Sequence, residues 1–347
     1  MKKKTLSLIM VAAMVISCLF TGCGGSSNDK TSQSAGESKA SGKYDGKVTL
    51  AMTSWVGYAP LLIAKEKGYF EKYGVDMEII QSDSGSDKRS ALQAGEIQGY
   101  PAATSSVMMT AAAGVNVKQV CGIDYSNGSD GIVAKNDIKS ISDLKGKTVA
   151  LDQSGSASLF FFQYVLSKYN MTLDDVTVVD MASSDAGAAF VAGQVDAAVT
   201  WEPYLSKGAE TKFGHKLVDS SEYNEAIAET LLMDADFTEK YPETVKGIVQ
   251  AWYDALDYIK ENKEDSYKIM GDGIGQSVSD VETNIKYVKF IDEAGTEEFF
   301  GKNGDSDSTL KTVCNMIVDL WSKSKIIDGS IDVDKTIDYD FIHPGLK

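Results

Sequence analysis

The stretch "KTVALDQSGSASLFFFQYVLSKYN", residues 147–170, contains a strand, a turn and a helix in direct succession. "KTVAL" is a short apolar run typical of a buried strand, and "DQSGS" supplies turn residues. The segment after it has apolar residues at helical spacing, and "VTVVDM", residues 176–181, is a second strand. A strand–helix–strand order predicts a parallel sheet covered by helices.

The same order occurs on both sides of this stretch. On the N-terminal side the predicted elements are a strand at 47–55, a helix at 59–74, a strand at 75–83, a helix at 87–95 and a short strand near 97–102. On the C-terminal side they are a helix at 184–194 and strands at 195–200 and 215–220. The chain therefore builds one α/β unit and then a second of similar plan.

Two extended segments without helices join these units. "VCGIDYSNGSDGIVAKN", residues 120–136, reads as strand, glycine turn and strand, and "ETLLMDADF", residues 229–237, is the extended return. They predict a two-strand hinge between a first lobe, residues 47–130 and 232–347, and a second lobe, residues 131–231. The apolar stripes of the last third predict helices that pack on the first lobe.

The N-terminus has the pattern of a secretory signal. Three lysines precede an apolar run that is shorter than the ~20 residues of a bilayer span. Its end, "LFTGC", resembles a bacterial lipobox, which predicts a signal peptide at 1–22 and lipidation of Cys23. The polar residues 23–46 predict a flexible tether, so we expect a lipid anchor at the extracytoplasmic face of the cell membrane. A plain secretory signal with an incidental cysteine is the alternative.

Composition excludes several classes of partner. Loss of three lysines with the signal would move the formal charge from −16 to −19, which argues against nucleic acid and anionic lipid. Only Cys121 and Cys314 remain in the body of the chain, too few for a disulfide framework, and their pairing cannot be deduced. Arg89 is the single arginine.

Several motifs, in the right order, resemble the nitrate/sulfonate/taurine group of ABC-transporter substrate-binding proteins. Besides the lipobox they are "WVGYAPLLIAKEKGYFEKYGVDMEII" (55–80), "GSDGIVAK" (128–135), "SISDLKGKTVAL" (140–151) and "AAFVAGQVDAAVTWEPYLS" (188–206). The resemblance implies a periplasmic-binding-protein type II fold, with two α/β lobes, parallel-type sheets and a ligand held between the lobes. It also implies delivery of that ligand to an ABC permease and its ATPase. We expect a monomer without a cofactor.

The ends of the strands supply the candidate binding residues, because ligands of open α/β sheets lie beyond the carboxyl ends of the strands. This rule selects Ser54, Trp55, Tyr58, Tyr100, Thr104, Ser105, Ser154, Ser156, Ser158 and Asp185. Hydroxyls and backbone N–H groups at a helix N-terminus suit an anionic group on the ligand. Helix capping is the open alternative for each serine, and the favoured one for Asp185.

Two carboxylates point to a positively charged ligand. Asp130 occupies the place where taurine-type relatives carry a glutamate, and Glu202 follows Trp201 at the end of a strand. Tryptophan beside a carboxylate can add a cation–π contact of about 0.5–2 kcal/mol. Serines for an anion and carboxylates for an amine predict a small zwitterion. We therefore expect a small organic solute that is taurine-like or sulfonate-like, or another amine-bearing compound. Ion pairs to lysine across the hinge, and packing of Trp201 in its lobe, are the alternatives.

The sequence offers four rival functions. Enzymes with this fold include thiamine-pyrimidine synthases, but the only histidines, His215 and His343, lie outside the strand-end residues, so we expect no catalysis. The acidic turns lack the spacing of a calcium loop, so we expect no metal site. Import of a small inorganic anion such as nitrate or bicarbonate, and a sensor lipoprotein without transport, remain the alternatives.

Overall fold

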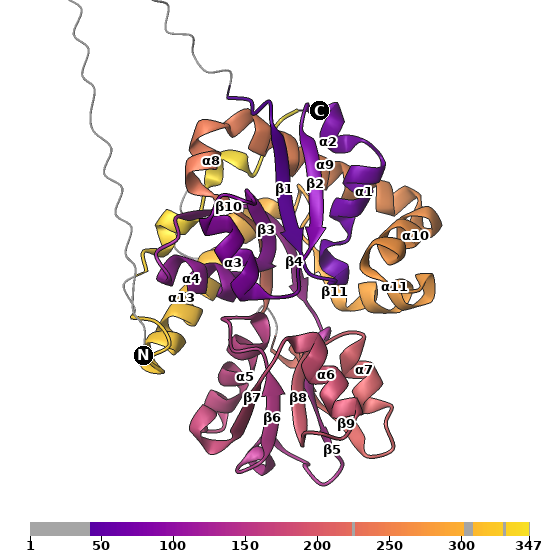
Figure 1. The fold of residues 1–347 in the computed structure, drawn as a ribbon, viewed down its shortest axis with the longest axis vertical. Coiled ribbons are helices and arrows are strands. Elements are labelled where there is room, and N and C mark those ends of the chain that lie inside the picture. Colours follow the sequence, from indigo (N-terminus) through magenta and orange to yellow (C-terminus); the bar gives the residue numbers. More distant parts are fainter. Residues whose placement is uncertain (1–41, 224–225, 302–307, 329–330, 347) are drawn as a thin grey trace, which may run out of the picture. The chain divides into compact units, whose positions relative to one another are not determined.

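The computed structural model describes residues 42–223, 226–301, 308–328 and 331–346, so the predicted signal peptide, Cys23 and most of the tether lie outside the described residues. The described chain is an α/β protein with two sheets (Figure 1). This confirms the predicted fold class. We call each sheet with the helices that cover it a lobe, the first and the second. No helix in these ranges is long and apolar enough to cross a membrane.

The first lobe contains a six-stranded sheet in the order β11-β4-β10-β3-β1-β2. Its strands are β1 (Lys47–Met52), β2 (Asp76–Gln81), β3 (Gly99–Ala103), β4 (Val117–Ser126), β10 (Ala228–Asp234) and β11 (Val288–Phe290). β1 pairs in parallel with β2 and β3, whereas β10 runs antiparallel to β3 and β4. β1 ends three residues before the predicted end at Trp55, which instead precedes the 3₁₀ turn η1 (Val56–Tyr58).

The second lobe contains a five-stranded sheet in the order β7-β6-β8-β5-β9. Its strands are β5 (Asp130–Lys135), β6 (Thr148–Leu151), β7 (Thr177–Asp180), β8 (Ala197–Trp201) and β9 (Gly214–Asp219). β6 pairs in parallel with β7 and β8, and β5 is antiparallel to β8 and β9. Each sheet is therefore mixed. β5 and β10, the first strands after the chain passes from one lobe to the other, are antiparallel to their neighbours.

Helices cover both sheets. Those of the second lobe are α5 (Ala157–Lys168), α6 (Ser183–Val191) and α7 (Tyr204–Ala209). Outside that lobe the chain forms α1 (Pro60–Glu66), α2 (Tyr69–Lys72), α3 (Gly85–Gln93), α4 (Thr104–Ala112), α8 (Ala235–Lys240), α9 (Pro242–Glu261), α10 (Lys263–Ile274), α11 (Val278–Asn284), α12 (Thr296–Phe300) and α13 (Thr309–Lys323). The helix predicted at 59–74 is two helices, because Gly68 between them has a left-handed φ of 72°.

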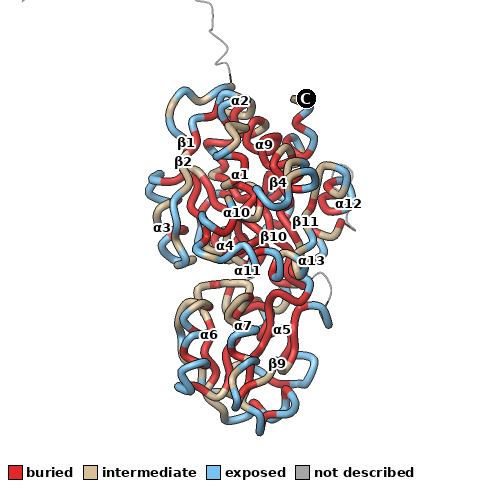
Figure 2. The backbone as a smooth tube through the Cα atoms, turned by 90° about the vertical axis from the view of Figure 1, so that its right-hand side faces the viewer, coloured by how far each residue is buried: buried red, intermediate tan, exposed pale blue. Residues whose placement is uncertain are grey.

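The apolar side chains form clusters that agree with the predicted stripes. α9 buries Val245, Ile248 and Trp252 in one cluster with β1 and α1, so this helix packs on the first lobe as predicted. α13 contacts α4 and also α5 of the second lobe, where Trp321 Nε1 donates to Gln163 Oε1 at 2.7 Å. Figure 2 shows buried residues in the interior of each lobe and exposed residues at its outer turns. Cys121 and Cys314 are both buried free thiols.

Candidate ligand-binding site

A cavity of about 90 Å³ is lined by residues of both lobes. One water needs about 10–15 Å³ in this measure, so the cavity suits a small solute rather than a peptide. Its lining comprises Thr53, Trp55, Tyr58, Asp83, Gly85, Lys88, Ala102, Ala103, Ser106, Asp130, Asp152, Ser154, Ser156, Ala157, Ser158, Ser183, Ser184, Trp201 and Glu229. Most of these residues follow the carboxyl ends of strands, the place where open α/β sheets bind ligands.

Two tryptophans from different lobes meet at this cavity. Trp55 follows β1 and Trp201 ends β8, and their ring centroids are 5.8 Å apart with an interplanar angle of 84°. Trp55 is buried and its Nε1 donates to Asp124 Oδ2 at 3.3 Å, and this hydrogen bond holds the indole ring in place. The two rings form an aromatic wall that suits an apolar or cationic group.

Buried carboxyl groups lie beside this wall. Asp130 and Glu229 are each 4 % exposed, and the hydroxyl of Tyr58 donates to Glu229 Oε2. Burial raises the pKa of Asp130 to about 7, an effect that a hydrogen bond from Ser126 opposes and the charge of Glu202 reinforces. Burial likewise raises the pKa of Glu229 well above its usual value. The cavity therefore holds carboxyl groups whose ionised form is disfavoured by burial and would be stabilised by a positive charge.

Lys88 is the one cationic side chain among the lining residues. It projects from α3, is 6 % exposed, and its Nζ lies 5.4 Å from the centroid of the Tyr100 ring. Burial lowers the pKa of Lys88 to about 8, although the charges of Glu229, Asp83 and Asp152 raise it.

Serine hydroxyls gather at the N-termini of α5 and α6 on the other side of the cavity. Ser156 caps α5 by accepting from Leu159 N at 3.2 Å, and its hydroxyl donates to Asp152 O at 2.7 Å. The hydroxyls of Ser158 and Ser183 are 2.8 Å apart, so the starts of the two helices are joined by a hydrogen bond. Ser156 thus both caps α5, the alternative that the sequence offered for each serine, and lines the cavity.

Of the thirteen predicted binding residues, seven line the cavity: Trp55, Tyr58, Asp130, Ser154, Ser156, Ser158 and Trp201. Four other predicted residues do not line the cavity, because they hydrogen-bond to neighbouring side chains or are buried at the start of a helix. Ser54 bonds Asp83, Tyr100 is buried against Thr110, and Thr104 and Ser105 are buried at the start of α4. Tyr100 lies one residue into β3, so its side chain points to the core rather than to the strand end.

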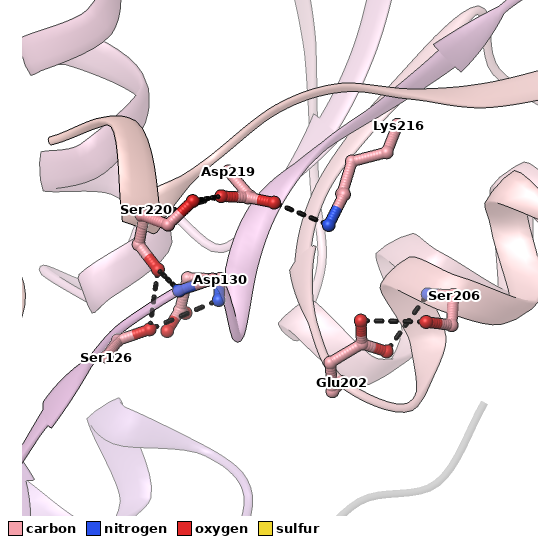
Figure 3. A network of polar contacts seen from close by, with 9 residues as sticks. Ser126, Asp130, Glu202, Ser206, Lys216, Asp219 and Ser220 are labelled. Atoms are coloured by element: carbon pink, nitrogen blue, oxygen red, sulfur yellow. Dashed lines mark hydrogen bonds and ion pairs between the residues drawn. The ribbon is translucent and has the colours of Figure 1, made fainter. Parts of the chain in front are cut away.

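Asp185 and Glu202 are also outside the lining. Asp185 is exposed in the first turn of α6, where a carboxylate suits the helix dipole. Glu202 is 2 % exposed and accepts from Ser206 N at 3.0 Å and Ser206 Oγ at 2.8 Å, at the beginning of α7. Figure 3 shows the Glu202 carboxylate turned toward Ser206, whereas Asp130 lies with Ser126 near the hinge.

The hinge itself is held by a polar network (Figure 3). The hydroxyl of Ser220 is 2.8 Å from that of Ser126 and accepts from Gly128 N at 2.7 Å, and Ser126 Oγ accepts from Asp130 N at 3.2 Å. Asp219 pairs with Lys216 just before the second crossing. These contacts fix the backbone from which the Asp130 carboxyl group reaches the cavity.

Sequence reasoning missed eight polar lining residues: Thr53, Asp83, Lys88, Ser106, Asp152, Ser183, Ser184 and Glu229. Asp83 and Asp152 follow β2 and β6, so the strand-end rule was able to find them. Glu229 stands near the beginning of β10, and only the antiparallel direction of that strand brings it to the edge where its neighbours end. Lys88 carried no signal, because one lysine in a polar helix is ordinarily solvated.

Arg89 lies at the boundary of the two lobes. Its guanidinium donates to the carbonyl of Ser154 at 3.4 and 3.5 Å, so it contacts the second lobe, and it is outside the lining of the cavity. Within the described residues, no group of three or more histidine, cysteine, aspartate or glutamate side chains is placed to hold a metal ion.

Two α/β lobes with a polar cavity between them are the arrangement of the periplasmic-binding-protein fold. Solved structures agree. The alkanesulfonate-binding protein SsuA of Xanthomonas axonopodis pv. citri, bound to MOPS, has a TM-score of 0.72 at 18% identity and covers 85% of this chain and 99% of its own. The periplasmic nitrate-binding protein NrtA of Synechocystis has a TM-score of 0.59 at 17% identity, over 84% and 90%. At these identities the likeness establishes the fold alone.

The chain belongs to the NMT1-like family, whose model matches residues 42–271. A Bacillus subtilis (strain 168) protein named as an aliphatic sulfonates-binding protein is 27% identical over 297 residues, which are 83% of this chain and 85% of that protein. The predicted membership of the nitrate/sulfonate group of binding proteins is thereby confirmed.

Proposed function

We propose that this protein is an extracytoplasmic lipoprotein, anchored through Cys23, that captures a small amine-bearing organic solute between its lobes. It delivers this solute to an ABC permease driven by an ATPase. Family membership and the sulfonate- and nitrate-binding relatives support the class of function. The amine group of the proposed ligand is not taken from these relatives. It is inferred from the side chains that line the cavity of this chain.

The observation that carries the proposal is the charge of the cavity wall. Asp83, Asp130, Asp152 and Glu229 line the cavity, and Lys88 is the one lining cation. An ammonium group placed between Asp130 and Glu229 would compensate the buried carboxylates, whose desolvation is costly without a partner. The faces of Trp55 and Trp201 would add cation–π attraction.

The opposite side of the cavity suits an anionic group. Ser158, Ser183 and Ser184 lie in the first turns of α5 and α6, which have twelve and nine residues. Backbone N–H groups and the positive ends of the helix dipoles favour an anion there. An amine on one side and a sulfonate or carboxylate on the other describe a small zwitterion, of which taurine is one sulfonate example.

A second candidate is a ligand without an amine, such as an alkanesulfonate or nitrate. Two observations favour it: Lys88 is buried in the cavity, and the named relatives bind sulfonates and nitrate. An anionic ligand would favour the protonated form of the carboxyl groups in the cavity, so its binding would raise the number of protons that they hold. Binding of an ammonium group would lower that number.

A matched pair of ligands tests the two candidates. Taurine and isethionate differ only in an amine and a hydroxyl at the same carbon, so thermal-shift and calorimetric titrations with both isolate the amine. We expect taurine or another amine of a panel containing ethanolamine and n-propylamine to stabilise the protein, by ~2.7 kcal/mol at a hundredfold excess over Kd. Stabilisation by isethionate, ethanesulfonate, nitrate or bicarbonate and by no amine would refute the proposal.

A further inference from the structure

Two buried carboxyl groups stand side by side on the strands of the hinge. Asp124 of β4 and Glu229 of β10 are directly opposite each other in the antiparallel register. Side chains of directly opposite residues lie on the same face of a sheet, where two like charges destabilise each other. Asp124 is fully buried and Glu229 is 4 % exposed, so water does not screen this repulsion.

The hydrogen bonds of the pair leave one oxygen without a partner. Asp124 Oδ2 accepts from Trp55 Nε1, and Glu229 Oε2 takes the hydroxyl of Tyr58. Asp124 Oδ1 is buried and has no hydrogen-bond partner in the described part of the chain. Gly57 leaves room for this arrangement, because a Cβ there would overlap Asp124 Oδ2 and Trp55 Nε1.

The surrounding charges do not neutralise the pair. Asp130 on β5 adds a third negative group, and Lys88 on α3 is the cation that acts on Glu229. Lys289 on β11, next to the partner of Asp124 in that strand, lies over the ring of Tyr125 instead. Among the described residues, no ion pair joins Asp124 or Glu229 to a cation.

Two carboxylates in such a place cannot both ionise at moderate cost, so protonation of one of them is favoured. The pKa values of Asp124 and Glu229 are both raised, chiefly by burial. Glu229 lines the cavity, and Asp124 accepts a hydrogen bond from Trp55, which also lines it, so a positive charge in the cavity would act on both carboxyl groups.

We propose that the Asp124–Glu229 pair holds a proton while the cavity is empty and releases it to solvent when an ammonium group binds. The ammonium keeps its own proton, and the proton of the pair passes to water or buffer. Capture of an amine is therefore linked to pH: affinity rises with pH, and acidification favours release. This inference rests on the proposed amine ligand.

Calorimetry in two buffers tests the linkage. The amine that binds most tightly among taurine, ethanolamine and n-propylamine is titrated at pH 7 in phosphate and in Tris, whose ionisation enthalpies differ widely. We expect binding heats that differ between the buffers by the release of ~0.5–1 proton per amine bound, and a Kd that falls ~3–10-fold for each pH unit between 6 and 8.

The variant Asp124→Asn keeps the size of the side chain and an acceptor for Trp55 but removes one charge. We expect it to lose most of the proton release, whereas Asp319→Asn, at an exposed position on α13, keeps it. Potentiometric titration of the ligand-free proteins adds a second readout, since Asp124→Asn should lack one titration step between pH 6 and 9.

The outcomes separate this inference from the proposed function. Binding of an amine with equal heats in both buffers would overturn the proton release and leave the amine ligand intact. A panel in which only anions bind would overturn both. If Asp124→Asn does not fold, the same titrations of Asp130→Asn decide, because the pKa of Asp130 is also raised. Proton release that persists without Asp130 comes from the Asp124–Glu229 pair, and its complete loss in Asp130→Asn would overturn the inference.

Discussion

Trp55 and Trp201 meet edge to face at the cavity, although they are 146 positions apart in the chain and belong to different lobes. Trp201 is also directly opposite Asp130 in the antiparallel pairing of β8 with β5. One ring of the aromatic wall and one carboxyl group of the cavity are therefore cross-strand neighbours. Contact between residues of both lobes is what a ligand must stabilise if it favours a closed state.

Trp201→Ala is expected to weaken binding of an amine more than it destabilises the protein, because this ring is only partly buried. Loss of a cation–π contact of ~1–2 kcal/mol corresponds to a Kd about 5–30 times higher. Calorimetry measures the affinity, and Tyr169→Ala, an exposed ring at the end of α5, serves as the control. An unchanged Kd would remove Trp201 from the contact surface.

Asp130→Asn is expected to stabilise the empty protein and to weaken amine binding. The folded pKa of Asp130, about 7, exceeds the usual 3.8, so the folded state binds more protons between these values. The stability contributed by the protonated group is complete below pH 3.8 and is lost as pH rises through 7. At pH 8 we expect the Tm of the ligand-free variant to rise by ~2–6 °C and its amine affinity to fall at least tenfold. A lower Tm and an unchanged affinity would contradict the role of Asp130.

Lys88→Met is expected to raise the Tm of the ligand-free protein at pH 7, because it removes a buried cation. The folded pKa of Lys88, about 8, is below the usual 10.5, so folding expels a proton and stability increases as pH rises from 8 to 10.5. Thermal denaturation between pH 7 and 10 should show this slope in the unmodified protein and a smaller one in the variant. Lys323→Met, on the exposed side of α13, is the control. A Tm lowered at pH 7 would mean that Lys88 is paired more strongly than its surroundings indicate.

Glu202→Gln tests whether Glu202 binds the amine, as the sequence predicted for both Asp130 and Glu202. Since Glu202 caps the start of α7 through Ser206, we expect a loss of ~0.5–2 kcal/mol in the free energy of unfolding. Amine affinity should stay within about twofold, in contrast to Asp130→Asn. Chemical denaturation and calorimetry measure both quantities, and a tenfold loss of affinity would return Glu202 to the binding site.

Several elements were predictable because their signals are local. The strand at β6, the turn before Ser156 and the helix α5 follow from apolar spacing and a capping serine within 24 residues. The same spacing placed Trp55 and Trp201 at strand ends, and both line the cavity. Local spacing did not reveal that Gly68 divides the helix predicted at 59–74, because a glycine in a helical pattern is often tolerated.

By itself the sequence determined two α/β lobes, two extended crossings and a set of strand-end residues, since each depends on periodicity within one segment. Only the tertiary structure decided which carboxyl groups meet. β5 and β10 run antiparallel to their neighbours. This brings Asp130, the first residue of β5, and Glu229, the second residue of β10, to the edge where the parallel strands end. Strand direction depends on pairing between distant segments, which no local pattern encodes. For the same reason Asp124 became visible only as the cross-strand partner of Glu229.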